Sequence, residues 1–345
     1  MLIVFIPLFT IPYVSRVLGA ENIGLFSYTY AVANYFVLFA NLGIKNYGSR
    51  TIAMVRNNKE ELNRNFSEIL SIHIIFSIIV IFVYLVLLFF FVEDNLVIFL
   101  IQSIYVFAAV FDINWFFFGI EKFKLTVGRN TLVKILSVFL VLVFVKTQTD
   151  LWIYALILAL SVFVGQSVVW FALKQYVSWR RPSWANMKQH IRPLFVLFLP
   201  ILALSLYKYM DKIMLGSISS NVQVGFYENA EKIINVPMSL IMAFGVVLMP
   251  RIANMVTSKD KGEVFKLIDM SMEAVMLLAI AISFGLAGIS FVLAPIFFGY
   301  EFEECGILIM GLAVTVPFMA FANVIRTQYL IPVSYTHLTL PTTSR

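Results

Sequence analysis

The chain has 345 residues, of which 61% are hydrophobic, 16% aromatic and only 13% charged, and its mean hydropathy is +0.91; such a composition excludes a water-soluble globular domain and is typical of a polytopic membrane protein. The net charge of +6 requires no nucleic acid as a partner, because the basic residues lie between the apolar segments. The single cysteine, Cys305, excludes an intrachain disulfide and a thiolate metal cluster, and the three scattered histidines indicate neither a metal site nor a cofactor.

Ten apolar segments predict an all-α membrane protein. A helix needs about 20 residues to cross the hydrocarbon core. The predicted spans are Met1–Val14, Leu25–Ile44, Ile69–Val92, Leu96–Gly119, Leu132–Val145 with its flanks, Leu151–Leu173, Leu194–Leu215, Ala230–Val247, Met270–Phe298 and Ile307–Leu330. The first covers only about 21 Å as a helix, so we expect the native sequence to begin upstream.

The basic residues predict the orientation of these spans. Alternate loops, at residues 45–64, 122–134, 174–192 and 251–266, hold eighteen lysines and arginines, whereas the intervening loops hold only Arg16 and Lys146. Basic loops remain in the cytoplasm in membrane proteins. We therefore expect a multi-pass membrane protein with a cytoplasmic N-terminus.

The end of the chain abandons the apolar pattern. Residues 333–345 read VSYTHLTLPTTSR, which resembles a translated sequencing adapter. We interpret this segment as a non-native tail that replaces the native continuation; the alternative is a genuine polar C-terminus. We expect a chain lacking the missing spans to be poorly stable and inactive.

A weak internal repeat divides the chain. Gly24 precedes Arg50 by 26 residues, and Gly225 precedes Arg251 by the same interval. Parallel repeats of this kind occur in transporters. The pattern predicts an N-terminal lobe at residues 1–173, a cytoplasmic linker at 174–193, a partial C-terminal lobe at 194–332 and the tail at 333–345.

The seventh predicted span carries charges that a membrane helix rarely tolerates. Lys208, Asp211 and Lys212 are three and four residues apart, which places them on one face of a helix. Each charge inside a bilayer costs about 2.5–3.5 kcal/mol on insertion scales, so such residues face protein or water. This face either lines a polar cavity or is a helix end whose lysines extend outward and pair with Asp211.

Asp112 lies deep in the fourth predicted span. A carboxylate there is placed either to accept a proton that couples transport to an ion gradient, or to pair with Lys122 or a neighbouring helix. The sequence leaves both interpretations open.

Several motifs are similar to those of bacterial polysaccharide flippases of the Wzx type, in the MOP superfamily. They are PYVSRVLGAENIG (residues 12–24), NLGI (41–44) with GSR (48–50), NWFFFGIEKF (114–123), DKIMLG (211–216) with VGFY (224–227), and Pro250-Arg251. The resemblance extends from residue 7 to about residue 330. It implies a two-lobe bundle of parallel six-helix repeats whose second lobe is truncated here.

The resemblance implies that the protein translocates an undecaprenyl-diphosphate-linked oligosaccharide by alternating access and is not an enzyme. It also implies a polysaccharide polymerase and a chain-length regulator as partners. A diphosphate needs a cationic cavity, and Lys208, Lys212 and Arg16 are the residues we expect to supply it. Arg16 has an equal alternative as an interfacial anchor.

Two rival functions remain. A MATE-like multidrug or ion antiporter would share the two-lobe plan, although its cavity should be acidic rather than lysine-rich. A membrane enzyme of polysaccharide assembly, such as a polymerase or acyltransferase, would need a large outer loop or a catalytic His/Asp pair, and the outer loops here are short.

Overall fold

The computed structural model describes residues 2–257 and 261–330, which form helices joined by short turns, with no strand in this part of the chain. Eight helical segments among these residues are long and apolar enough to cross a membrane. The prediction of an all-α, multi-pass membrane protein is therefore confirmed. The predicted non-native tail, residues 333–345, lies outside the described residues.

The helices group by their contacts into two compact units, which are described separately. One unit is Tyr13–Gly225, and the other combines Met1–Pro12 with Phe226–Arg345. The predicted lobes, with their boundary in the linker at 174–193, follow the sequence repeat rather than contacts and stay a prediction.

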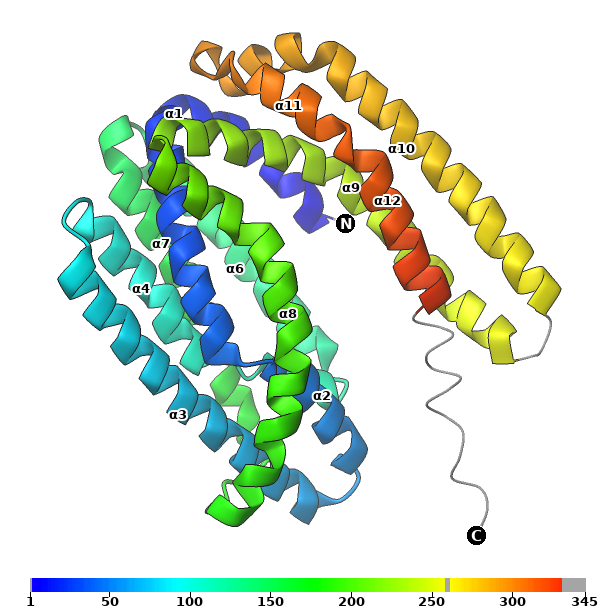
Figure 1. The fold of residues 1–345 in the computed structure, drawn as a ribbon. Helices are drawn as coiled ribbons and strands as arrows, with labels where there is room; N and C mark the ends of the chain where they lie inside the picture. The colour runs from blue at the N-terminus through cyan, green and yellow to red at the C-terminus, as the bar shows by residue number, and fades with distance from the viewer. Residues whose placement is uncertain (1, 258–260, 331–345) are drawn as a thin grey trace. The chain divides into compact units, whose positions relative to one another are not determined.

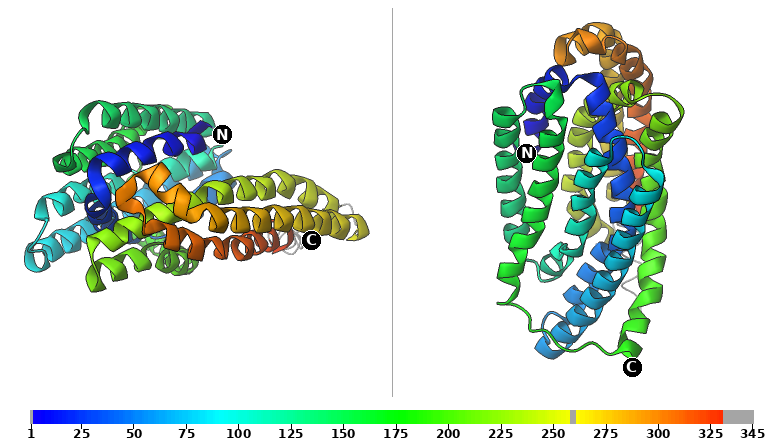
Figure 2. Two further views of the ribbon diagram at one scale, coloured as in Figure 1. Left: turned by 90° about the horizontal axis from the view of Figure 1, so that it is seen from above. Right: turned by 90° about the vertical axis from the view of Figure 1, so that its left-hand side faces the viewer.

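The unit Tyr13–Gly225 contains most of the helices (Figure 1). They are α1 (Leu2–Asn41), α2 (Ile44–Val55), α3 (Lys59–Phe91), α4 (Leu96–Val110), α5 (Asn114–Gly119), α6 (Phe123–Phe144), η1 (Gln148–Asp150), α7 (Leu151–Leu173) and α8 (Trp184–Ile218). α3 packs along α4, α4 along α7, and α7 along α6, and the views of Figures 1 and 2 agree that α3 and α4 run side by side. In this bundle α3 and α4 run antiparallel to each other, as do α6 and α7.

Large apolar side chains cover the outside of this bundle. Phe82, Phe89, Phe90 and Phe91 of α3 are all more than 65% exposed, and Phe171 of α7 is 81% exposed. Exposing so many aromatic rings to water would oppose folding, whereas in hydrocarbon they need no cover. The outward face of this unit is therefore a lipid-facing surface.

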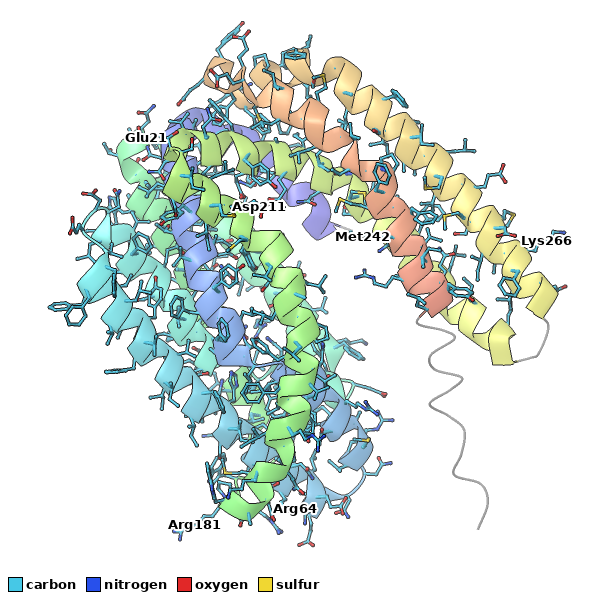
Figure 3. The ribbon with its side chains drawn as sticks, viewed as in Figure 1. Glu21, Arg64, Arg181, Asp211, Met242 and Lys266 are labelled. Carbon is cyan, nitrogen blue, oxygen red and sulfur yellow. The ribbon has the colours of Figure 1, made fainter. Side chains whose placement is uncertain are left out.

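The two ends of the unit differ in charge. Figure 3 shows Arg64 and Arg181 together at one end and Glu21 at the other. Helix α3 begins at this end, where Asn58 is its N-cap: the Asn58 side chain accepts hydrogen bonds from the backbone N–H groups of Glu60 and Glu61. The loops rich in lysine and arginine at 45–64 and 174–192 thus meet at one end, which we call the basic end.

One break lies between two predicted spans and another lies inside a predicted span. Gly19, between the predicted spans Met1–Val14 and Leu25–Ile44, has φ 78° and ψ 171° within α1, a conformation that glycine adopts without strain. The fourth predicted span, Leu96–Gly119, is divided into α4 and α5 by a turn at residues 111–113. There the Asp112 carboxylate accepts a hydrogen bond from the backbone N–H of Asn114 at 3.0 Å, which competes with the helical pattern.

The aromatic motif after this turn forms the contact between α5 and α2. Trp115, Phe116 and Phe117 are at most 2% exposed. A Cβ added at Gly48 would lie 2.6 Å from the Trp115 ring, and one added at Gly119 would lie 2.6 Å from Ile52. These glycines let the two helices approach closely, so this motif has a packing role.

The start of α9 (Asn221–Thr257) crosses α1 within the same unit. A Cβ added at Gly24 would lie 1.6 Å from the carbonyl oxygen of Asn221, and one added at Gly225 would lie 2.1 Å from that of Ala20. A shift of 201 residues relates Gly24 to Gly225 and also Ala20 to Asn221. The crossing is therefore reciprocal, and it joins equivalent positions of the predicted repeat.

The second unit is a smaller helical layer. After α9 it contains α10 (Lys261–Phe298), η2 (Tyr300–Phe302), α11 (Cys305–Ala313), α12 (Thr315–Val324) and η3 (Ile325–Leu330). Its core joins three helices through Met238 of α9, Ala279 of α10 and Val316 of α12, all at most 1% exposed. Buried Cys305 donates to the Phe226 carbonyl at 3.2 Å.

Candidate functional site

The charged face of α8 lies in its second half. Lys208 is exposed, whereas Asp211 and Lys212 are half-buried, and Figure 3 shows Asp211 on the part of α8 that lies away from the basic end. The Lys208 ammonium lies 5.2 Å from the centre of the Tyr209 ring. A cation over a ring gains about 0.5–1 kcal/mol at an exposed site, which leaves the ammonium protons available to an anion.

Tyr35 of α1 anchors this face of α8. Its hydroxyl donates to the Ser205 carbonyl at 3.4 Å, and its ring meets the Tyr209 ring edge-on at 5.9 Å. Asp211 interacts electrostatically with the same hydroxyl. Tyr35 therefore holds the backbone and the aromatic ring next to Lys208 in place.

Arg16 lies on α1 between two residues that bind the segment joining α6 to α7. The Tyr13 hydroxyl donates to the carbonyl of Val145, the residue that follows α6, at 2.7 Å, and the Asn22 side chain donates to the Gln148 carbonyl at 3.1 Å. The Arg16 side chain is exposed. Its convergence with Lys208 and Lys212 on one anion stays a prediction.

Asp112 belongs to a polar network between α5, α6 and α7. Besides the backbone of Asn114, it accepts a hydrogen bond from the Asn114 side chain at 2.6 Å, and Asn114 donates to Gln166 at 2.8 Å. Asp112 also interacts electrostatically with Arg129 of α6 and with buried His73 of α3. These contacts favour pairing as its role.

Arg129 completes this network. The sequence groups Arg129 with the basic residues of a loop, whereas the structure places it inside α6, half-buried. Its guanidinium donates to the Gly165 carbonyl at 2.7 Å and to the Asn114 side chain at 3.2 Å. Its position three residues before the predicted span Leu132–Val145 was the available signal.

We expect Arg129→Met to lower the free energy of unfolding by about 1–3 kcal/mol, the cost of leaving buried acceptors without donors. The substitution keeps the apolar stem but removes the hydrogen bonds to Gly165 and Asn114. Thermal unfolding in detergent measures the effect. Arg129→Lys should recover part of the loss, and Leu132→Ala, at a position of α6 that is 67% exposed, should change little. Equal stability of Arg129→Met and wild type would contradict this role.

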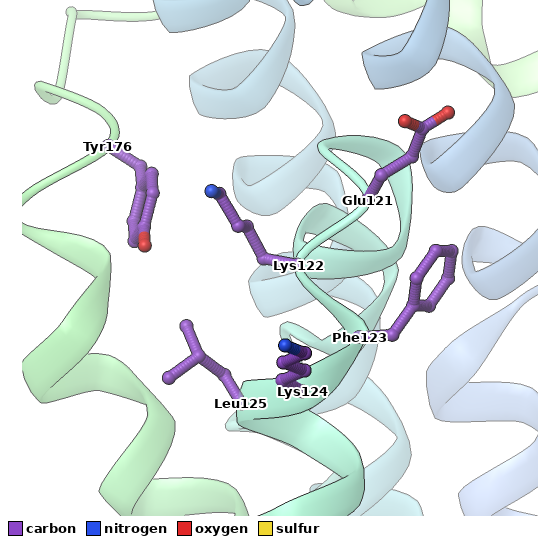
Figure 4. A pocket seen from close by; sticks show the side chains of 6 residues that line it. All are labelled: Glu121, Lys122, Phe123, Lys124, Leu125 and Tyr176. Carbon is purple, nitrogen blue, oxygen red and sulfur yellow. The ribbon is translucent and has the colours of Figure 1, made fainter.

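An open cavity of about 390 Å³ lies at the turn between α5 and α6. Glu121, Lys122, Phe123, Lys124, Leu125 and Tyr176 line it (Figure 4). Glu121 pairs with Arg56 at 2.6 Å, and Figure 4 shows Lys122 extending toward Tyr176. None of the predicted site residues lines this cavity. Among residues 2–257 and 261–330, no cluster of His, Cys, Asp or Glu is placed to hold a metal ion.

Comparisons with known proteins agree with the motifs. Residues 1–256 match the family described as "Polysaccharide biosynthesis protein". A protein of Escherichia coli (strain K12) named "Putative O-antigen transporter" is 26% identical over 338 residues, covering 96% of this chain and 80% of the relative. Its namesake in Shigella dysenteriae is 23% identical over 341 residues, covering 94% of this chain and 82% of the relative.

A solved structure shares the fold. The structure titled "Lipid II flippase MurJ, inward closed conformation" superposes with a TM-score of 0.69 at 15% identity, covering 94% of this chain and 73% of that one. At this identity the likeness shows the fold alone. Together with the family match, these findings support the resemblance found in the motifs: the chain belongs to the polysaccharide biosynthesis protein family.

Proposed function

We propose that the protein translocates an undecaprenyl-diphosphate-linked oligosaccharide across the bacterial inner membrane by alternating access between two helical lobes. The similarity to named O-antigen transporters along 96% of the chain carries this proposal. The flippase fold and the charged residues within apolar helices support it. A diphosphate cannot cross hydrocarbon unaided, because burying its charge is far too costly.

The cations on α8 and α1 suit the diphosphate. Lys208 and Lys212 with Arg16 would bind its oxygens through charge-assisted hydrogen bonds, which strengthen where water is scarce. Tyr35 and Tyr209 stand beside Lys208, and such rings can also stack on the apolar faces of sugars. Asp211, next to Lys212, would neutralise the site while it is empty.

Asp112 has a structural role in this proposal. Its described contacts are those of a paired carboxylate in the Arg129 network, which favours pairing over the alternative of ion coupling. It would fix the turn between α4 and α5.

The basic end faces the cytoplasm in this proposal, as basic loops do in membrane proteins, and the N-terminus lies on the same side. The lobes would be residues 1–173 and 194–332. The exported oligosaccharide would then be taken up outside by a polysaccharide polymerase acting with a chain-length regulator.

Genetic complementation tests the function. The gene is expressed in a strain that lacks its own O-unit flippase, and surface polysaccharide is measured on gels. Return of surface polysaccharide is the expected result. If polysaccharide does not return but the cells become resistant to cationic dyes, the protein is a drug exporter and the proposal is wrong.

A further inference from the structure

Three polar side chains from three helices meet inside the unit Tyr13–Gly225, near its basic end. The Nδ1 atom of His190 on α8 lies 2.6 Å from the hydroxyl of Tyr47 on α2. Its Nε2 atom lies 3.0 Å from a carboxylate oxygen of Glu68 on α3. The side chains of His190 and Glu68 are only 3% and 1% exposed. Both ring nitrogens are thus engaged, and the carboxylate is removed from water.

The cluster is enclosed by apolar side chains. Leu42, Ile69, Ile72, Met187 and Leu194 belong to the same core and are all at most 4% exposed. The charged residues nearest to the cluster in sequence on its three helices are exposed at the basic end; they are Lys45, Arg50, Arg64, Lys188 and Arg192. A second buried histidine, His73 of α3, interacts with Asp112. The titratable groups within the cluster are therefore Tyr47, Glu68 and His190.

Burial decides how many protons the cluster holds. A carboxylate beside a neutral imidazole would leave one negative charge in an apolar core, which is costly without a compensating cation. One additional proton, shared between His190 and Glu68, makes the cluster neutral. This proton belongs to the pair rather than to either residue. In water, by contrast, histidine is mostly neutral and glutamate ionised at neutral pH.

The cluster joins α8 to α2 and α3, and α8 contains two prolines at which it can bend. His190 is three residues before Pro193 and ten before Pro200, both inside α8. Each proline removes a backbone hydrogen bond from the helix and allows it to bend. The contact of α8 with the rest of the bundle is close here, because a Cβ at Gly43 would lie 3.0 Å from the Leu194 carbonyl.

We propose that Tyr47, Glu68 and His190 form a proton-binding latch: the cluster takes up one proton when the basic end of α8 closes onto α2 and α3, and releases it when that end opens. Because the closed state binds more protons than the open state, acid favours closure and alkali favours opening. The Tyr47 hydroxyl, which can donate to or accept from Nδ1, serves either protonation state.

The latch would give the carrier a way to use protons. An alternating-access carrier must open and close each end in turn, and a site that binds a proton in only one state links that step to the proton gradient. This use in transport rests on the proposed function. The latch itself is tested without substrate, so its failure would leave the flippase proposal standing.

The test measures the distance between the two helices. Spin labels are placed at Arg64→Cys on α3 and Lys188→Cys on α8, both exposed, while native Cys305 is buried and reacts poorly. Distance distributions are recorded by electron–electron resonance between about pH 5 and about pH 8, where histidine titrates. We expect the short-distance population to dominate at the lower pH and a longer one to grow at the higher pH.

Variants assign this response to the cluster. The double variant Glu68→Gln/His190→Gln lacks both partners of the pair, so its distribution should not change with pH. Tyr47→Phe removes one hydrogen bond but keeps the His190–Glu68 pair, so the response should persist with a shifted midpoint. Gln189→Ala, on the exposed side of α8, should behave as wild type. A wild-type distribution that is the same at both pH values overturns the latch even if the double variant does not fold, as does an unaltered response in the double variant or an unshifted midpoint in Tyr47→Phe.

Discussion

Alanine at Gly24 or at Gly225 should leave little correctly folded protein in the membrane. In either variant the new methyl group would lie 1.6 Å or 2.1 Å from a carbonyl oxygen of the crossing helix, that of Asn221 or Ala20. A carbonyl within a helix cannot rotate away as a side chain does, so the helices must separate. Overpacking among movable side chains already costs about 1–3 kcal/mol, and we expect each variant to exceed that range.

Thermal unfolding in detergent, together with the amount of protein in the membrane, measures this effect. Gly128→Ala is the matched control, because a Cβ there meets nothing within 4 Å and alanine favours a helix more than glycine does. It should be neutral or slightly stabilising. If Gly24→Ala and Gly225→Ala unfold at the wild-type temperature, the close helix crossing is wrong.

Replacing Lys208 or Lys212 of α8 with alanine should abolish most transport. Each charge-assisted hydrogen bond to a phosphate contributes about 1.5–3 kcal/mol, so Lys208→Ala and Lys212→Ala should each slow transport by roughly tenfold to a hundredfold. Lys208 lies against the Tyr209 ring rather than in the core, so folding should be preserved in its variant. Surface polysaccharide per unit of membrane protein, in the flippase-deficient strain, measures the loss.

Two substitutions separate a binding role from a general effect of charge. Lys208→Arg keeps a cation and should retain most transport, whereas Lys59→Ala removes an exposed lysine at the start of α3 and should be neutral. Full transport by Lys208→Ala and Lys212→Ala at normal protein levels would remove both lysines from the proposed site and leave the flippase function intact.

The sequence predicted the fold class because hydrophobic length is a local property. Apolar runs of the required length identified nearly all of the long helices, and the spacing of basic loops predicted which of them share an end. The break at Gly19 falls between two predicted spans, whereas the break in the fourth span was harder to predict. Asp112 lies inside an apolar run, and its side-chain hydrogen bond competes with the helical pattern there.

In the candidate site, too, the sequence identified individual residues, whereas contacts between residues distant in sequence required the fold. The charges at Lys208, Asp211 and Lys212 were evident because they interrupt an apolar helix. The pairing of Glu68 with His190 was not, since 122 residues separate them and neither breaks a recognisable pattern. In the sequence His190 is one of three scattered histidines. Likewise, the repeat of Gly24 and Gly225 was visible in the sequence, but their contact required the fold.

Direct observation of lipid translocation tests the central claim. The purified product of the native gene is reconstituted into vesicles that contain undecaprenyl-diphosphate-linked oligosaccharide in both leaflets, and a membrane-impermeant glycosidase then digests whatever is exposed outside. With the protein present, digestion should proceed beyond the outer leaflet until nearly all of the oligosaccharide is cleaved, and more slowly in Lys208→Ala vesicles. Digestion that stops at the outer-leaflet fraction, equal to that of protein-free vesicles, would contradict the account.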